Sequence, residues 1–178
     1  TPAPEVAPGT GERGSADAGL DVQALRVALI GYGEVGGIFA RALRERGVAA
    51  LTTYDRLFDD SARRVAALAR ARADGVTTAA DSRSAVRGAD LVLCAVTADQ
   101  TLAAANATAP GLVPGTPYVD VNSASPRTKI GCAAVVDAAG GRYVEAAVMT
   151  SVPPYGIGVP VLWGGPHAAA VAPLLAAL

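Results

Sequence analysis

The sequence predicts an α/β domain built on a doubly wound parallel sheet with extra strands at its C-terminal end. From about residue 24 onward, short apolar runs alternate with helical patterns, and this alternation is typical of parallel sheets. Residues 91–96 (LVLCAV) are apolar at every position, as expected of a central strand that helices cover on both faces. A glycine-rich turn joins the first apolar run directly to the first helical pattern.

Local patterns place the individual elements. The short apolar runs predict strands over residues 25–30, 48–54, 76–78, 91–96, 118–121, 143–148 and 159–163. Helices are expected over residues 34–46, 59–73, 82–87, 99–107 and 126–139, followed by an alanine-rich helix at the end. Gly47 supplies a C-cap for the first helix, and Pro126 starts another at a position that needs no N–H donor. In the second helix, Val65, Leu68 and Ala69 are expected to face inward.

The chain divides into a tail and one domain. Residues 1–23 are rich in Pro, Gly, Ala and Ser and have no periodic apolar pattern, so we expect them to be disordered. The sequence has 178 residues, of which 51% are hydrophobic, and residues 24–178 suffice for one domain with a sizeable core. The tail contains no signal-peptide pattern, which favours a cytoplasmic location.

Charge and cysteine content exclude several kinds of partner. Lys and Arg number 15 against 16 Asp and Glu, so the net charge of −1 gives no electrostatic reason to expect nucleic acid or an anionic membrane. No apolar run approaches the roughly 18 to 20 residues that a membrane-spanning helix needs. Cys94 and Cys132 fit neither a metal-ligand spacing nor a disulfide scaffold, so we expect two reduced, buried cysteines and no metal site.

The first predicted strand ends in a turn with the pattern G-x-G-x-x-G. The turn opens a helix and comprises Gly31, Tyr32, Gly33, Glu34, Val35 and Gly36. In a dinucleotide-binding turn of the Rossmann type, the first glycine permits a tight turn, the second lets the backbone approach a pyrophosphate, and the third allows close helix–strand packing. Free N–H groups at the start of the helix then bind the anion. We predict an NAD(P) site here; a turn that serves packing alone is the alternative.

An acidic residue follows the second predicted strand, at about the spacing that this fingerprint requires. Asp55 comes directly after residues 48–54, where its carboxylate would accept hydrogen bonds from an adenosine ribose and repel a 2′-phosphate. This position slightly favours NAD. The neighbouring Arg56 could pair with a 2′-phosphate, so NADP stays open. The alternative for both residues is a solvated loop.

Polar residues also follow the strand expected over residues 118–121. The carboxyl ends of parallel strands face the ligand crevice, so Asn122 and Ser123 are candidates for binding a substrate hydroxyl or carboxylate. Ser125, by contrast, precedes Pro126 and is explained as a helix N-cap.

From about residue 26 to the end, the chain resembles the cofactor domain of the β-hydroxyacid dehydrogenases, the family of 3-hydroxyisobutyrate dehydrogenase and 6-phosphogluconate dehydrogenase. The resemblance lies in ALIGYGEVG, in ADLVLCAVTAD, in DVNSASP (the family has D-x-S-T-x-S-P), in GGRYVEAAVM and in PVLWGG. It implies an NAD(P)-dependent oxidoreductase that moves hydride between the nicotinamide and a secondary alcohol of a small hydroxy acid. By position, Val96 and Thr97 would line the nicotinamide side, and Ser123 would hold the substrate with Asn122 beside it.

The chain departs from the family pattern at two places. Where the family has Ser-Gly-Gly for the substrate carboxylate, this chain has Met149, Thr150 and Ser151, and we assign Met149 and Thr150 to substrate binding. The family's general acid/base is a lysine from a helical second domain that also builds a homodimer. The only lysine here, Lys129, lies elsewhere, and Leu178 ends the sequence before that domain would begin.

We therefore assign no catalytic residue and expect this chain to be the cofactor-binding portion of a longer, homodimeric enzyme, inactive alone. Two alternatives stay open. One is a dinucleotide-binding module without turnover. The other is an imine reductase-like enzyme, a group that resembles this family but replaces the lysine with another proton donor.

Overall fold

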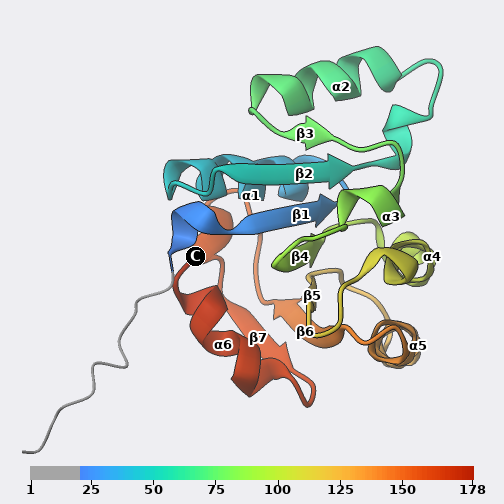
Figure 1. The fold of residues 1–178 in the computed structure, drawn as a ribbon, viewed down its shortest axis with the longest axis vertical. Helices are drawn as coiled ribbons and strands as arrows, with labels where there is room; N and C mark the ends of the chain where they lie inside the picture. Colours follow the sequence, from blue (N-terminus) through green and yellow to red (C-terminus); the bar gives the residue numbers. More distant parts are fainter. Residues whose placement is uncertain (1–20) are drawn as a thin grey trace, which may run out of the picture.

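Seven strands form one sheet in the order β3-β2-β1-β4-β5-β6-β7 (Figure 1). The strands are β1 (Arg26–Ile30), β2 (Ala50–Tyr54), β3 (Thr77–Thr78), β4 (Leu91–Cys94), β5 (Pro117–Asp120), β6 (Arg142–Val148) and β7 (Val161–Gly164). The first six strands run parallel, and β7 runs antiparallel to β6. The computed structural model describes residues 21–178. The predicted α/β fold, doubly wound with extra C-terminal strands, is confirmed.

Helices cover both faces of this sheet. They are α1 (Glu34–Glu45), α2 (Arg64–Ala73), α3 (Ser82–Ala85), α4 (Thr101–Thr108), α5 (Pro126–Ala138) and α6 (Ala168–Ala176). Buried residues of α1, α2 and α6 pack on one face, and those of α3, α4 and α5 pack on the other. In Figure 1, α4 and α5 lie side by side beyond β4 and β5, while α6 closes the other face beside β7.

Strand β1 is buried on both sides because its residues alternate between the two layers. Val27 and Leu29 point into the layer of α1, and Ala28 and Ile30 point into the layer of α3, α4 and α5. All four residues of β4 are buried in the same way. The apolar run that predicted a central strand therefore reflects a sheet with no solvent-facing side at its centre.

The expected disorder of residues 1–23 falls mostly outside the described residues, which begin at Asp21. For residues 21–23 the expectation is wrong. These residues enter a short 3-10 turn, η1 (Val22–Ala24), and the Asp21 carboxylate caps it by accepting a hydrogen bond from the Gln23 N–H at 3.0 Å. The ordered domain starts just before β1, because this cap satisfies a backbone donor.

The expected inner face of the second helix is wrong at two of its three residues. Val65 is 80% exposed and Ala69 is also exposed, whereas Leu68 is partly buried against the core as expected. The fully buried residues of α2 are Ala67 and Ala71. The helix begins only at Arg64, because residues 56–58 form a separate 3-10 turn, η2 (Arg56–Phe58). Since α2 packs beside the edge strand β3, it has little sheet to cover, and Ala67, Leu68 and Ala71 make the contact.

The antiparallel direction of β7 follows from the segment that precedes it. This segment contains one 3-10 turn, η5 (Gly156–Gly158), which packs against α1 and does not form a crossover helix. The Met149 N–H donates to the Pro160 carbonyl at 3.0 Å, which closes the two strands into an antiparallel pair. A parallel strand would need a longer crossover, usually a helix.

Within residues 21–178, no helix has the length and apolarity needed to cross a membrane. The same residues contain no group of His, Cys, Asp or Glu side chains arranged to hold a metal ion.

We expect Leu29→Ala to lower the free energy of unfolding by about 2–5 kcal/mol, because Leu29 is fully buried in the central strand. Leu162→Ala is the matched control. Its side chain is 62% exposed, so the change should stay within about 0.5 kcal/mol. Urea denaturation followed by circular dichroism measures both values, and equal losses would contradict this placement of the core.

Candidate functional site

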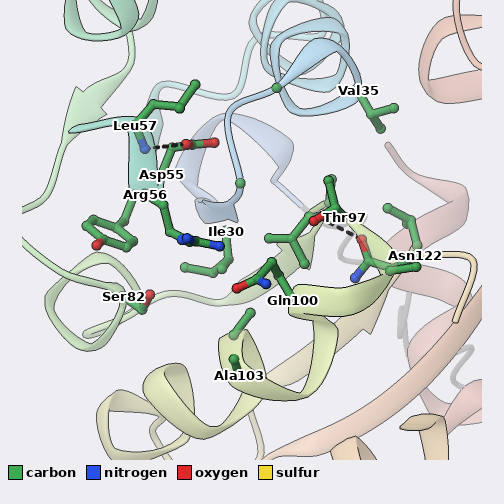
Figure 2. Close-up of a pocket in the computed structure, with 18 of the residues that line it drawn as sticks. Ile30, Val35, Asp55, Arg56, Leu57, Ser82, Thr97, Gln100, Ala103 and Asn122 are labelled. Atoms are coloured by element: carbon green, nitrogen blue, oxygen red, sulfur yellow. Dashed lines mark hydrogen bonds between the residues drawn. The ribbon is translucent and has the colours of Figure 1, made fainter. Parts of the chain in front are cut away.

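A large cleft opens at the carboxyl ends of β1, β2, β4, β5 and β6, with a volume of about 1240 Å³. The order of the sheet reverses between β1 and β4, and ligands of open α/β sheets bind at this point. Figure 2 shows Asp55 and Arg56 on one side of the cleft and Thr97 and Asn122 on the other. We call these sides the Asp55 half and the Asn122 half.

The first and third glycines of the turn are required by the chain itself. Gly31 has φ +93°, and a Cβ on it would lie 2.2 Å from the Ala95 carbonyl oxygen. A Cβ on Gly36 would lie 2.2 Å from the Gly31 carbonyl oxygen. Any larger residue would therefore push β1, β4 and α1 apart. Both glycines take the structural roles that the fingerprint predicted.

The second glycine is different, because nothing in the chain requires it. Gly33 has φ −74° and ψ −153°, a conformation open to any residue, and a Cβ on it would meet no heavy atom within 4 Å. It is the N-cap of α1 and lines the cleft with Glu34 and Val35. The first N–H groups of α1 have no helical partner at this end. The bare backbone therefore faces open space beside a helix N-terminus, which suits a closely bound anion.

Tyr32 lies behind the turn and does not line the cleft. Its side chain is fully buried, and its hydroxyl donates to Asp74 Oδ2 at 2.7 Å. Burial, together with that carboxylate, raises the pKa of the Tyr32 hydroxyl well above its usual range. The guanidinium of Arg70 donates to the Tyr32 carbonyl and lies 5.5 Å from the centre of the ring. The prediction that Tyr32 binds cofactor is therefore wrong for its side chain, which anchors the turn instead.

Asp55 joins the ends of β1 and β2. Its Oδ2 accepts the Tyr32 N–H at 2.6 Å, and its Oδ1 caps η2 by accepting the Leu57 N–H at 2.8 Å. Each oxygen keeps one further lone pair for a ligand. Arg56 is exposed and its side chain extends into the cleft below Asp55 (Figure 2). The structure thus brings the predicted acid and its basic neighbour together at one end of the cleft.

The Asn122 amide is occupied within the protein. Its Oδ1 accepts the Val96 N–H at 2.6 Å, and its Nδ2 donates to Asp120 Oδ1 at 2.7 Å and to Cys94 Sγ at 3.4 Å. Only 6% of Asn122 is exposed. Asn122 also lines the cleft, and its amide takes a structural role that holds the strand end at Val96. A role of Asn122 in substrate binding stays a prediction.

The other predicted residues of this half divide into two groups. Val96, Thr97, Ser123 and Thr150 line the cleft. Met149 does not line it, and its side chain is 57% exposed. Met149 lies between two residues that do line the cleft, Val148 at the end of β6 and Thr150 just beyond it.

Sequence reasoning missed a buried charge pair beneath this half of the cleft. Lys129 Nζ lies 3.1 Å from Asp120 Oδ1, and Tyr143 donates its hydroxyl to Asp120 Oδ2 at 2.7 Å. The one available signal was the presence of a single lysine in an arginine-rich chain. The two cysteines are buried and free as expected, and burial raises the pKa of the Cys94 thiol to about 12, which suits no nucleophile.

A family model described as the NAD binding domain of 6-phosphogluconate dehydrogenase matches residues 26–178. Among solved structures, a conserved hypothetical protein from Sinorhizobium meliloti 1021 is 38% identical with a TM-score of 0.80, over 89% of this chain and 53% of that one. A conserved protein of unknown function, reported as structurally similar to 3-hydroxyacid dehydrogenases, is 31% identical with a TM-score of 0.69, over 84% and 54%. An imine reductase from Streptomyces aurantiacus is 26% identical with a TM-score of 0.68, over 85% and 51%.

The chain therefore spans about half the length of the solved structures that it matches. No curated protein matches it.

The contrast between the glycines of the turn is testable. We expect Gly36→Ala to lower the free energy of unfolding by roughly 2 kcal/mol or more, because its Cβ would overlap the Gly31 carbonyl. Gly33→Ala should stay within about 1 kcal/mol of the wild type, because the new methyl group points into open space. Urea denaturation measures the free energy of unfolding of both variants. A Gly36→Ala variant as stable as the wild type would refute the packing role.

Proposed function

Because the chain belongs to the family defined by the NAD binding domain of 6-phosphogluconate dehydrogenase, we propose that it binds NAD or NADP in the cleft and presents the nicotinamide to a small-molecule alcohol or carbonyl substrate. The observation that carries this proposal is Gly33. Glycine at this position is unnecessary for the fold, yet it leaves the start of α1 accessible to a pyrophosphate.

The lining residues suit the separate parts of a dinucleotide. Gly33 and the first turn of α1 would hold the pyrophosphate, and Asp55 and Arg56 would contact the adenosine. Val96 and Thr97 would lie on the nicotinamide side, with Ser123 and Thr150 available to a substrate hydroxyl or carboxylate. When bound, the nicotinamide supplies the hydride chemistry, and these residues supply binding and orientation.

The two halves of the cleft differ in charge. All the charged lining residues belong to the glycine turn or to the Asp55 half: Glu34, Asp55, Arg56, Asp60, Arg63, Asp81 and Arg83. On the Asn122 half, the described lining side chains are apolar, amide or hydroxyl groups. Moving a hydroxyl proton during hydride transfer requires a positioned acid or base. We therefore propose that this group comes from outside residues 21–178, in an enzyme of which this chain is the cofactor-binding portion.

The uncharged Asn122 half also favours a second candidate, an imine reductase-like activity. A hydroxy acid substrate gains from a cationic partner for its carboxylate, which the described residues of this half lack, whereas an imine needs none, and one solved relative is an imine reductase. A small hydroxy acid stays the first candidate because another neighbour is reported to resemble 3-hydroxyacid dehydrogenases. Homodimerisation and a cytoplasmic location stay predictions that rest on the resemblance and the sequence alone.

We expect Gly33→Val to abolish NADH binding, because the isopropyl group would occupy the space through which the pyrophosphate approaches α1. Gly158→Val is a matched control, since a Cβ there also meets no heavy atom within 4 Å and Gly158 does not line the cleft. Isothermal titration calorimetry of both variants tests the site. NADH binding unchanged by Gly33→Val would remove the proposed function.

The same titration separates the two cofactors. We expect the wild type to bind NADH about tenfold more tightly than NADPH, because a 2′-phosphate would meet the Asp55 carboxylate. Arg56→Ala should weaken NADPH binding further and leave NADH binding within about twofold. Arg87→Ala, an exposed arginine outside the cleft, is the control. If NADPH binds more tightly, Arg56 and not Asp55 sets the preference.

A further inference from the structure

The ion pair of Asp120 and Lys129 is buried, and burying it carries an unusually large desolvation free energy. Asp120 is completely buried and Lys129 is 5% exposed, and desolvating two charges offsets most of what their attraction returns. Lys129 Nζ reaches both the Asp120 carboxylate at 3.1 Å and the Asp120 backbone carbonyl at 3.2 Å. All other basic residues of the chain, apart from one histidine, are arginines, and its single lysine pairs with one carboxylate beneath the cleft.

The Asp120 carboxylate is fixed by three hydrogen-bond donors and one cation. Its Oδ1 accepts from the Asn122 backbone N–H at 3.0 Å and from Asn122 Nδ2 at 2.7 Å, and its Oδ2 accepts from the Tyr143 hydroxyl at 2.7 Å. Lys129 Nζ lies beside Oδ1 as its ion-pair partner and donates its hydrogen bond to the Asp120 backbone carbonyl. An ionised carboxylate offers acceptors only, so it can satisfy all three donors at once.

The fixed carboxylate determines how the Asn122 amide is oriented. Asp120 Oδ1 requires the NH₂ group of Asn122 on its side, and Cys94 Sγ accepts from the same nitrogen. The carbonyl oxygen of the amide therefore points the opposite way and accepts the Val96 N–H at 2.6 Å (Figure 2). An amide turned around would face this N–H with another donor.

The network reaches the cleft at Asn122 and Val96, which both line it. The preceding residue, Ala95, packs directly against Gly31, since a Cβ on Gly31 would lie 2.2 Å from the Ala95 carbonyl oxygen and 2.9 Å from Val96 Cγ1. The strand end is therefore held between the glycine turn on one side and the Asn122 amide on the other. Only the second of these contacts depends on a buried charge.

We propose that Lys129 is a positioning residue for the nicotinamide half of the cleft, acting through Asp120 and the Asn122 amide on the Val96 N–H. The inference rests on the proposed function, because it assumes that the Asn122 half receives the nicotinamide. It assigns the sole lysine a role other than proton transfer. Lys129 is 5% exposed and does not line the cleft.

The test compares two ligands in Lys129→Met, which keeps the length of the side chain and removes its charge. ADP-ribose contains the adenosine and pyrophosphate of NADH but lacks the nicotinamide. We expect the affinity for NADH to fall about tenfold, the loss typical of one hydrogen bond to a charged group, while ADP-ribose affinity stays within about twofold. Arg127→Met, an exposed cation on the same helix, should change neither affinity.

An independent signal comes from the Val96 backbone amide. In ¹H–¹⁵N spectra, its proton resonance should move upfield in Lys129→Met and stay in place in Arg127→Met, because only the first variant loosens the Asn122 acceptor. A merely structural role for Lys129 would lower both affinities together through instability and leave the Val96 resonance of the folded fraction unchanged. That result would overturn the proposal.

Two further variants keep the test decisive if Lys129→Met does not fold. The double variant Asp120→Asn/Lys129→Met buries no unpaired charge, and Asn122→Ala removes the last link while leaving the ion pair intact. Both should lose NADH affinity selectively, and equal affinity ratios for the two ligands in both variants would overturn the proposal. If the wild type binds neither NADH nor ADP-ribose, the proposed function fails. Wild-type binding of both with no selective loss contradicts only the role of Lys129.

Discussion

Gly31 lies where β1, the end of β4 and the start of α1 meet, and the three segments approach so closely that a Cβ has no room. Its hydrogen atom faces the Ala95 carbonyl, and its own carbonyl faces the Cα of Gly36. This contact sets the distance between the two central strands at their carboxyl ends, and it sets the angle at which α1 leaves the sheet. The cleft opens just beyond this point, where the strand order reverses between β1 and β4 and the chain leaves the two strands in opposite directions across the sheet.

Two polar networks support the walls on either side of that contact. Behind the turn, Tyr32 is held by Asp74 through its hydroxyl and by Arg70 through its carbonyl. Beneath the Asn122 half, the charge pair of Asp120 and Lys129 holds the amide that fixes Val96. Hydrogen bonds are directional, and in a buried setting they are strong, so they fix backbone positions that apolar packing alone leaves adjustable. Apolar residues build the layers, and polar groups set the cleft.

The sequence was sufficient to predict the elements and the glycine turn, because these depend on local patterns. Apolar runs located the strands, and the spacing of the three glycines located the turn between β1 and α1. Side-chain roles at the cleft were harder to predict, because their partners are distant in sequence. The sequence does not show that the Asn122 amide accepts the Val96 N–H. Lys129 and Asp120 are only nine residues apart, but no local pattern shows that the first turn of α5 places the lysine against the end of β5.

The face of α2 and the direction of β7 depend on tertiary position for a related reason. Val65 was expected inside on helical periodicity, but α2 lies at the sheet edge and packs on the core only through Ala67, Leu68 and Ala71. The antiparallel course of β7 depends on how the preceding segment packs against α1, which no local pattern encodes. In each case tertiary position decided between alternatives that were equally consistent with the sequence.

The N-cap of α1 bears on whether the domain is a working dinucleotide site or a retained fold. Ser, Asn or Asp at an N-cap accepts a hydrogen bond from the first turn, and glycine cannot, which forgoes a few tenths of a kcal/mol. Gly33 leaves those N–H groups without a side-chain partner, although its backbone conformation and surroundings would accept a capping residue. A domain shaped by stability alone would gain from such a cap. The unfilled N-terminus is explained if an anionic ligand supplies the missing acceptor, and that favours a site that still binds its cofactor.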